Sequence, residues 1–162
     1  MRIKKAVETI KNKLKASFEG FKVDDYPEDF SKYVFTAPKG CLLVRYDAST
    51  FSDPNVIDKV VQDEKAEIVV FMGLRYKQYA DCYDFLDDIK DVLTGLLIDD
   101  RKLYPKKRQY IKKIKGDFWW AYTFNLNTTS VQEQNLPNVV MLNKSAWAGS
   151  LSKGEGMAET LL

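Results

Sequence analysis

The chain has 162 residues, of which 45% are hydrophobic, and its three Trp, nine Tyr and nine Phe are enough to fill the core of one ordinary domain. Its 25 basic and 23 acidic residues give a net charge of +2, which gives no case for general affinity for nucleic acid or membranes, so any electrostatic argument must be local. It contains no histidine, which removes Ser-His and Cys-His nucleophile pairs and most zinc and non-haem iron sites.

The two cysteines, Cys41 and Cys82, lack the CxxC spacing of metal sites and redox switches. We therefore expect buried free thiols. The first residues interleave charges and carry no continuous apolar stretch, and no run of about 18 apolar residues occurs in the sequence. These patterns predict a chain made in the cytosol, without a secretory signal or a membrane span.

The first segment has the spacing of an amphipathic helix over residues 3–18. One face is apolar, with Ile3, Val7, Ile10, Leu14 and Phe18, and the other is charged, with Lys4, Lys5, Glu8, Lys11 and Lys15. A basic amphipathic helix can lie on a membrane or on DNA, but this apolar stripe is narrow and lacks Trp. We expect it to pack on its own domain.

Residues 19–39 are irregular in pattern and predict a loop or short strand pieces, after which two strands are expected at 41–47 and 66–77. In the first strand, "CLLVRYD", the alternation puts Arg45 and Asp47 on one face, where they can pair. Both lack the neighbours that activation of Ser49 as a nucleophile requires. The stretch "GCLLVRYDASTF" therefore predicts a core strand with a polar end. In the second strand, apolar residues on both faces favour a central position.

A helix is predicted over 79–100, because Cys82, Phe85, Leu86, Ile89, Leu93 and Leu96 fall on one stripe. Its other side carries a row of carboxylates, formed by Asp81, Asp84, Asp88 and Asp91 with Asp87 beside them. A rigid helix face cannot surround Mg²⁺ or Ca²⁺ without ligands from elsewhere. We favour a solvated face or a partner's basic surface over a metal site.

A basic strand follows at 101–115, with eight Lys or Arg residues and no acid. The candidate contact residues in it are Lys106, Lys107, Arg108, Lys112, Lys113 and Lys115. Tyrosines interleave the cations, so single-stranded nucleic acid is one interpretation. An acidic helix beside a basic strand also suits head-to-tail docking of subunits, which we favour. A two-residue turn of type II′ is predicted at Gly116-Asp117.

The returning strand at 118–129 places Phe118, Trp120, Tyr122, Phe124 and Leu126 on one face, which predicts core packing. After residue 130 the sequence is small and polar, apart from "NVVML" at 138–142, which has the pattern of one short strand. We therefore divide the chain into a domain at 1–130 and a C-terminal extension at 131–162. Trp147 and the Leu161-Leu162 end are candidate anchors on a neighbouring subunit.

The sequence gives little support for a catalytic site. The chain has no GxxxxGK[ST], GxGxxG or GxSxG pattern. The trios "PED" at 27–29 and "DEK" at 63–65 resemble the acid and acid-x-Lys grouping of Mg²⁺-dependent nucleases. That grouping needs the second trio on a core strand, whereas the pattern places it before the apolar run. No cofactor or metal is therefore expected.

The order of elements predicts an α/β (α+β) fold: a mixed, mainly antiparallel sheet with two amphipathic helices packed on it. The N-terminal helix, "GCLLVRYDASTF", "AEIVVFMGLRYK", "YDFLDDIKDVLTGLL" and "FWWAYTFNL" together resemble the Mu-like phage tail proteins related to tail terminators of contractile tails, which are tail completion proteins. The resemblance covers residues 1 to about 128 and rests on motif order.

This resemblance implies a non-enzymatic virion protein that is assembled in the host cytoplasm. It implies a ring, expected to be a hexamer, that caps the tail tube, ends tail polymerisation and joins tube and sheath to the head connector. Its partners would be other copies of the chain, the tail tube protein, the sheath protein and the head-tail connector. Nucleic acid would enter only as DNA passing through the ring lumen. The alternative is a nucleic-acid-binding module that uses residues 101–115.

Overall fold

The computed structural model describes residues 1–56 and 59–133. The elements in chain order are α1 (Ile3–Ser17), β1 (Phe21–Asp25), η1 (Phe30–Lys32), β2 (Gly40–Phe51), β3 (Asn55–Val56), β4 (Lys59–Leu74), η2 (Tyr79–Asp81), α2 (Cys82–Leu93), β5 (Leu97–Ile98), β6 (Arg101–Lys102), β7 (Tyr104–Ile114) and β8 (Asp117–Glu133). The chain divides into two compact units, Met1–Ser52 with Asp63–Thr129, and Asp53–Gln62 with Ser130–Leu162. The predictions for 138–142, Trp147 and Leu161-Leu162 lie outside the described residues.

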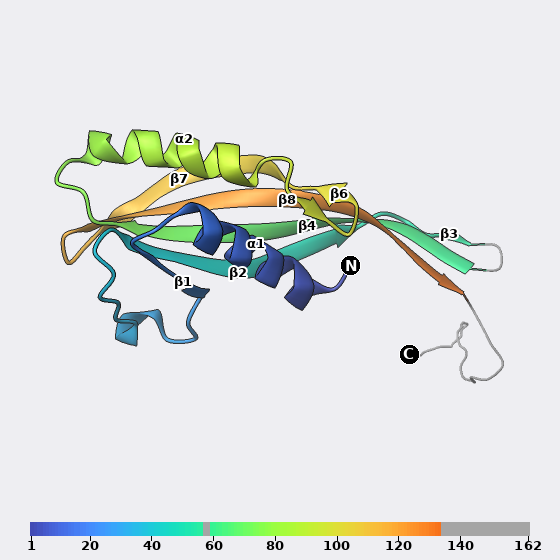
Figure 1. Cartoon of the computed structure of the whole chain (residues 1–162). Helices are drawn as coiled ribbons and strands as arrows, with labels where there is room; N and C mark the ends of the chain where they lie inside the picture. Colours follow the sequence, from blue (N-terminus) through green and yellow to red (C-terminus); the bar gives the residue numbers. More distant parts are fainter. Residues whose placement is uncertain (57–58, 134–162) are drawn as a thin grey trace. The chain divides into compact units, whose positions relative to one another are not determined.

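The first unit contains a mixed sheet in the order β1-β2-β4-β8-β7. β1 runs parallel to β2, whereas the β2–β4 and β7–β8 pairs are antiparallel. In the second unit, β3 pairs with the start of β4. The helices lie on the sheet as Figure 1 shows, with α1 in contact with β1 and β2, and α2 beside β7. The predicted α+β fold class is confirmed, and β1 and β7 are the two edges of the sheet.

The main core lies between the helices and one face of the sheet. The apolar stripe of α2 from Cys82 to Leu93 is buried there, as predicted, together with the predicted inward face of β8. The buried side of α1 differs from its predicted stripe, because Ala6 is fully buried whereas Ile3 is 43% exposed. Lys11, predicted to face solvent, is only 8% exposed, because it pairs with Glu8 at 3.0 Å and with Asp25 of β1 at 3.1 Å.

A smaller core covers part of the other face of the sheet. Trp119, Cys41 and Leu43 are buried there beneath the segment that joins β1 to β2. Phe30 meets the Trp119 ring edge-on, with ring centroids 4.8 Å apart. Arg75 holds the end of this segment by donating hydrogen bonds to the carbonyls of Phe35 and Ala37. The predicted irregular connection therefore has a structural role as a cover for this part of the sheet.

β2 and β4 are longer than the sequence patterns indicate. β2 continues to Phe51 through a bulge between Tyr46 and Ala48, which shifts the alternation of its side chains. β4 begins at Lys59 and therefore includes the polar trio at 63–65, which was predicted to precede the strand. The trio fits within a strand because Glu64 points inward to hydrogen-bonding partners, whereas its two neighbours point to the opposite face.

Two predictions near the ends of elements are wrong. The second helix ends at Leu93 instead of continuing to residue 100, because Gly95 adopts a φ of 85° and the chain then forms the β5–β6 hairpin. The turn between β7 and β8 consists of Lys115 and Gly116, with φ of 51° and 87°. Two positive φ values are typical of a type I′ turn, not of the predicted type II′ turn at Gly116-Asp117.

Candidate interaction surface

The acidic residues predicted on α2 are exposed, and they do not share one environment. Asp81 lies at the start of the helix, where its Oδ2 accepts a hydrogen bond from the backbone N–H of Gln78 at 3.2 Å. Asp84, Asp88 and Asp91 have no ion pair within the described part of the chain. Asp87, which sequence analysis placed only beside the row, is the carboxylate that pairs, with Arg108 of β7 at 3.2 Å.

The predicted cations of β7 fall into two groups. Two of them are paired within the chain, Lys106 with Glu67 at 2.6 Å and Arg108 with Asp87, and Lys113 lies over the Phe118 ring at 4.8 Å. The others, Lys107, Lys112 and the turn residue Lys115, are exposed and form no ion pair among residues 1–56 and 59–133. Trp147, the remaining candidate, lies outside the described residues.

The shape of β7 limits what can bind to it. It is an edge strand, yet it contains Pro105 and has irregular register at Lys106 and Ile111. Proline, lysines and bulges at an edge all hinder the addition of another strand. Tyr110 packs on Trp120 with ring centroids 5.3 Å apart, so this ring is engaged and cannot stack freely on a base. Contacts through side chains fit β7 better than extension of the sheet or base stacking.

The row of carboxylates on α2 and the basic strand β7 lie on the same edge of the first unit. The Asp87–Arg108 pair joins α2 to β7, and Tyr79 at the start of the helix meets Tyr110 of β7 at 4.9 Å between centroids. Two surfaces of opposite charge that are adjacent in one chain neutralise each other in part. A head-to-tail contact needs a second, different patch elsewhere on the chain.

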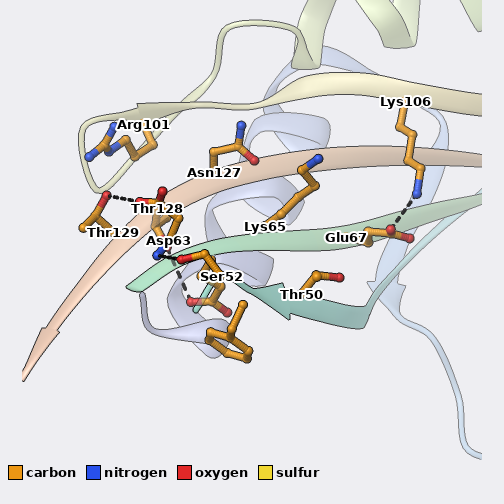
Figure 2. Close-up of a pocket in the computed structure, with 12 residues that line it drawn as sticks. Thr50, Ser52, Asp63, Lys65, Glu67, Arg101, Lys106, Asn127, Thr128 and Thr129 are labelled. Carbon is orange, nitrogen blue, oxygen red and sulfur yellow. Dashed lines mark hydrogen bonds and ion pairs between the residues drawn. The ribbon is translucent and has the colours of Figure 1, made fainter. Parts of the chain in front are cut away.

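A shallow depression of about 680 Å³ lies where β2, β4 and β8 carry polar side chains, and sequence analysis did not identify it. Figure 2 shows Lys106 reaching Glu67, and Ser52 and Thr129 both in contact with Asp63. Its lining includes hydroxyl and amide groups and charges of both signs, most of which are held by neighbours. The only sequence signal for it is the polar end of each strand.

Beside this depression, three strands contribute to a hydrogen-bonded chain of polar groups. The Tyr46 hydroxyl lies 2.6 Å from Ser49 Oγ, which donates to Glu64 Oε2 at 2.6 Å. Thr128 donates to the other oxygen of Glu64 at 3.4 Å. Glu64 is 8% exposed, so these partners offset the cost of burying its carboxylate. Ser49 is thus a structural donor to a buried acid.

The candidate catalytic groups do not assemble into a reactive site. Arg45 and Asp47 pair at 3.0 Å, as predicted. Both cysteines are free and buried, also as predicted, and burial raises the pKa of the Cys41 thiol to about 12, which leaves almost no thiolate at neutral pH.

The two trios of the nuclease pattern lie far apart. The backbone of Tyr26, beside the first trio, hydrogen-bonds to Val44 of β2, whereas the backbone of Asp63, in the second trio, hydrogen-bonds to Ser52. Ser52 follows Val44 by eight residues, which corresponds to roughly 25 Å along a strand. In the described residues, no three carboxylate or cysteine side chains are placed to hold a metal ion. Nor do the described helices include one long and apolar enough to cross a membrane.

A family model described as Gp37 protein matches residues 10–148. The matched range includes α2, β7 and β8, and it extends beyond residue 128, where the resemblance stated from the sequence ends. The chain matches no curated protein.

Proposed function

We propose that this chain is a structural protein of the virion tail. The proposal rests on its family, because the chain belongs to the Gp37 protein family, which is a family of phage proteins. The chain forms a hexameric ring that caps the tail tube, ends tail polymerisation and joins tube and sheath to the head connector. It is not an enzyme and needs no cofactor. The ring assembles in the host cytoplasm, and DNA passes through its lumen.

The observation that carries this proposal is the family match, which spans most of the chain. The geometry agrees with it, since the sheet has two free edges of different character, and a ring is built from two different patches that meet head to tail. The exposed charges of α2 and β7 are suited to orienting such a contact, because charged surfaces fix partner choice and register.

The alternative is a nucleic-acid-binding module that uses residues 101–115. Lys107, Lys112 and Lys115 favour it, because they are exposed and form no ion pair with the residues that the structure describes. The pairing of Lys106 and Arg108 within the chain, and the packing of Tyr110 on Trp120, count against it, because they remove two cations and a stacking ring. The ring is therefore the better supported proposal.

Light scattering on the purified chain, alone and with its tail tube protein, tests the ring. We expect either a closed oligomer or a monomer that becomes a ring on tube ends, with assembly weakening as salt rises. Reversing Lys112 and Lys113 to Glu should loosen the assembly at low salt, and added salt should then weaken it less than it weakens the wild type, because salt also screens the new repulsion. A wild-type chain that stays monomeric and is indifferent to tubes contradicts the proposal.

A further inference from the structure

The two edges of the sheet carry opposite patterns of charge, and this concerns which surfaces meet in the proposed ring. We propose that the α2–β7 edge of one copy docks against the α1–β1 edge of the next copy. The acidic side of α2 then meets the basic side of the neighbour's α1, and the basic strand β7 meets the acidic residues at the end of the neighbour's β1 and directly after it. The inference rests on the ring of the proposed function and specifies its interface.

The α1–β1 edge is basic on the helix and acidic below it. Lys4, Glu8, Lys11 and Lys15 share one side of α1, because they are spaced four, three and four residues apart, and Glu8 pairs with Lys11, so this side keeps a net charge of +2. That side faces β1, since Lys11 reaches Asp25 at 3.1 Å. Lys4 and Lys15 are exposed and form no ion pair in the described parts of the chain. Below them, the segment at 24–29 reads "DDYPED", with four acids. Asp25 pairs with Lys11 and Asp29 with Lys32 at 3.7 Å, so Asp24 and Glu28 are the two acids that form no ion pair in the described parts of the chain.

The α2–β7 edge has the reverse order. Asp84, Asp87 and Asp91 share one side of α2 by their spacing of three and four residues, and the Asp87–Arg108 pair shows that this side faces β7. Asp84 and Asp91 are exposed. Below them, Lys107 and Lys112 lie exposed on the strand.

Exposed apolar side chains gather on the same edge. Tyr79, Tyr83 and Ile111 are 39%, 51% and 42% exposed, and the two tyrosine rings contact each other with centroids 5.8 Å apart. Tyrosines surrounded by charged residues are typical of the centre of a protein interface.

Head-to-tail docking brings opposite charges together both between the helices and between the segments that lie below them. When the α2–β7 edge meets the α1–β1 edge, helix meets helix and strand meets strand with opposite charges in each layer. A two-fold contact between two α2–β7 edges that keeps both helices on the same face would place α2 opposite α2 and β7 opposite β7, and like charges in each layer repel each other. The charge pattern therefore selects a repeating contact that can close into a ring, and the proline and bulges of β7 favour side-chain contacts over a continuous sheet.

Complementation between two charge-reversed variants tests the pairing. The first variant, Asp84→Lys/Asp91→Lys, makes both helices of the chain basic at their edges, and the second, Lys4→Glu/Lys15→Glu, makes both acidic. Each alone places like charges at every contact, so we expect its mass by light scattering to fall from that of the ring to that of one chain at low salt. An equimolar mixture restores opposite charges at every contact of an alternating ring, and we expect it to regain the ring mass.

The control reverses a lysine that lies on neither edge. Lys65 is on the central strand β4 and is exposed. We expect Lys65→Glu to form rings like the wild type, and circular dichroism verifies that every variant is folded. Folded variants that assemble normally alone, or a mixture that stays monomeric, overturn the edge pairing while the wild-type ring stands. A wild-type chain that never forms rings, with or without tubes, overturns the ring and its interface together.

Discussion

Replacing Gly73 of β4 with alanine tests how tightly the smaller core is packed. A Cβ at this position would lie 2.6 Å from Cζ2 of Trp119 and 2.9 Å from Cε2 and Cη2. Such separations are far below the contact distance of two carbon atoms, which is about 3.5–4.0 Å. Either the indole ring or the strand must therefore move.

The indole ring has little room to move. Trp119 is 4% exposed and is packed with Cys41 and Leu43, and Phe30 meets it edge-on. Overpacking of this kind costs about 1–3 kcal/mol, and the loss of a flexible glycine from the unfolded chain offsets roughly 0.4–1 kcal/mol of that cost. We expect Gly73→Ala to lower the free energy of unfolding by about 1–2 kcal/mol.

Urea denaturation of four proteins measures this cost as a double-mutant cycle. The four are the wild type, Gly73→Ala, Trp119→Phe and the double variant. Phenylalanine lacks the outer ring of the indole, and Trp119→Phe also removes a buried Nε1 that has no hydrogen-bonding partner in the described structure. In the Phe background, we expect Gly73→Ala to cost about 1 kcal/mol less than in the wild type.

Two results would refute this reasoning. One is a Gly73→Ala variant as stable as the wild type, which would mean that the smaller core has free space beside Trp119. The other is an unchanged penalty in the Phe background, which would place the cost in the backbone of β4 instead of in the contact with the ring.

Three further predictions concern other parts of the chain. Ser49→Ala should cost about 1–2 kcal/mol in thermal unfolding, because it leaves the buried Glu64 carboxylate short of a donor, whereas Thr50→Ala on the exposed side should be nearly neutral. Burial raises the pKa of Cys41 to about 12 from its ordinary 9.0, so the folded chain keeps a proton that the unfolded chain loses. The contribution of the neutral Cys41 thiol to the free energy of unfolding is therefore complete below pH 9 and should decline as the pH rises toward 12, by at most about 1.4 kcal/mol per pH unit. In urea denaturation at a series of pH values, Cys41→Ser should make this decline smaller. Deletion of residues 145–162 should leave the circular dichroism spectrum native but weaken attachment to a neighbouring subunit or to sheath protein; a truncated chain that misfolds contradicts this.

The alternative function makes its own prediction about the exposed lysines of β7. If residues 101–115 bind nucleic acid, titration with a single-stranded oligonucleotide should show an affinity that falls steeply with salt. Lys107→Glu/Lys112→Glu would then abolish that binding. The ring predicts weak binding to the oligonucleotide at physiological salt, so tight binding that these substitutions remove would favour the nucleic-acid module.

The sequence predicted the parts of the fold where one periodicity runs uninterrupted. The stripe of α2 up to Leu93 and the inward face of β8 follow from spacing alone, because both elements bury one continuous apolar side. The pattern failed where a single residue changed the backbone. Leu96 continued the apolar stripe in sequence, yet Gly95 had already ended the helix.

Partners from distant segments explain the other differences. Lys11 is buried through Asp25, and Glu64 through Ser49 and Thr128, so charges that indicate solvent in sequence lie inside the structure. The candidate surface shows the same limit. Composition identified acidic and basic segments, but the Asp87–Arg108 contact, which puts them on one edge, depends on how α2 lies against the sheet.

The irregular edge of β7 also affects the reversibility of assembly. A protein with two different free edges is at risk of endless addition, since each copy exposes a new site for the next. Pro105 and the bulges hinder a continuous ladder of backbone hydrogen bonds between β7 and another copy, and such a ladder is what makes cross-β fibrils persistent. In the proposed ring, contacts limited to side chains would break and form again, so wrongly joined copies would separate and an arrangement that closes on itself would accumulate.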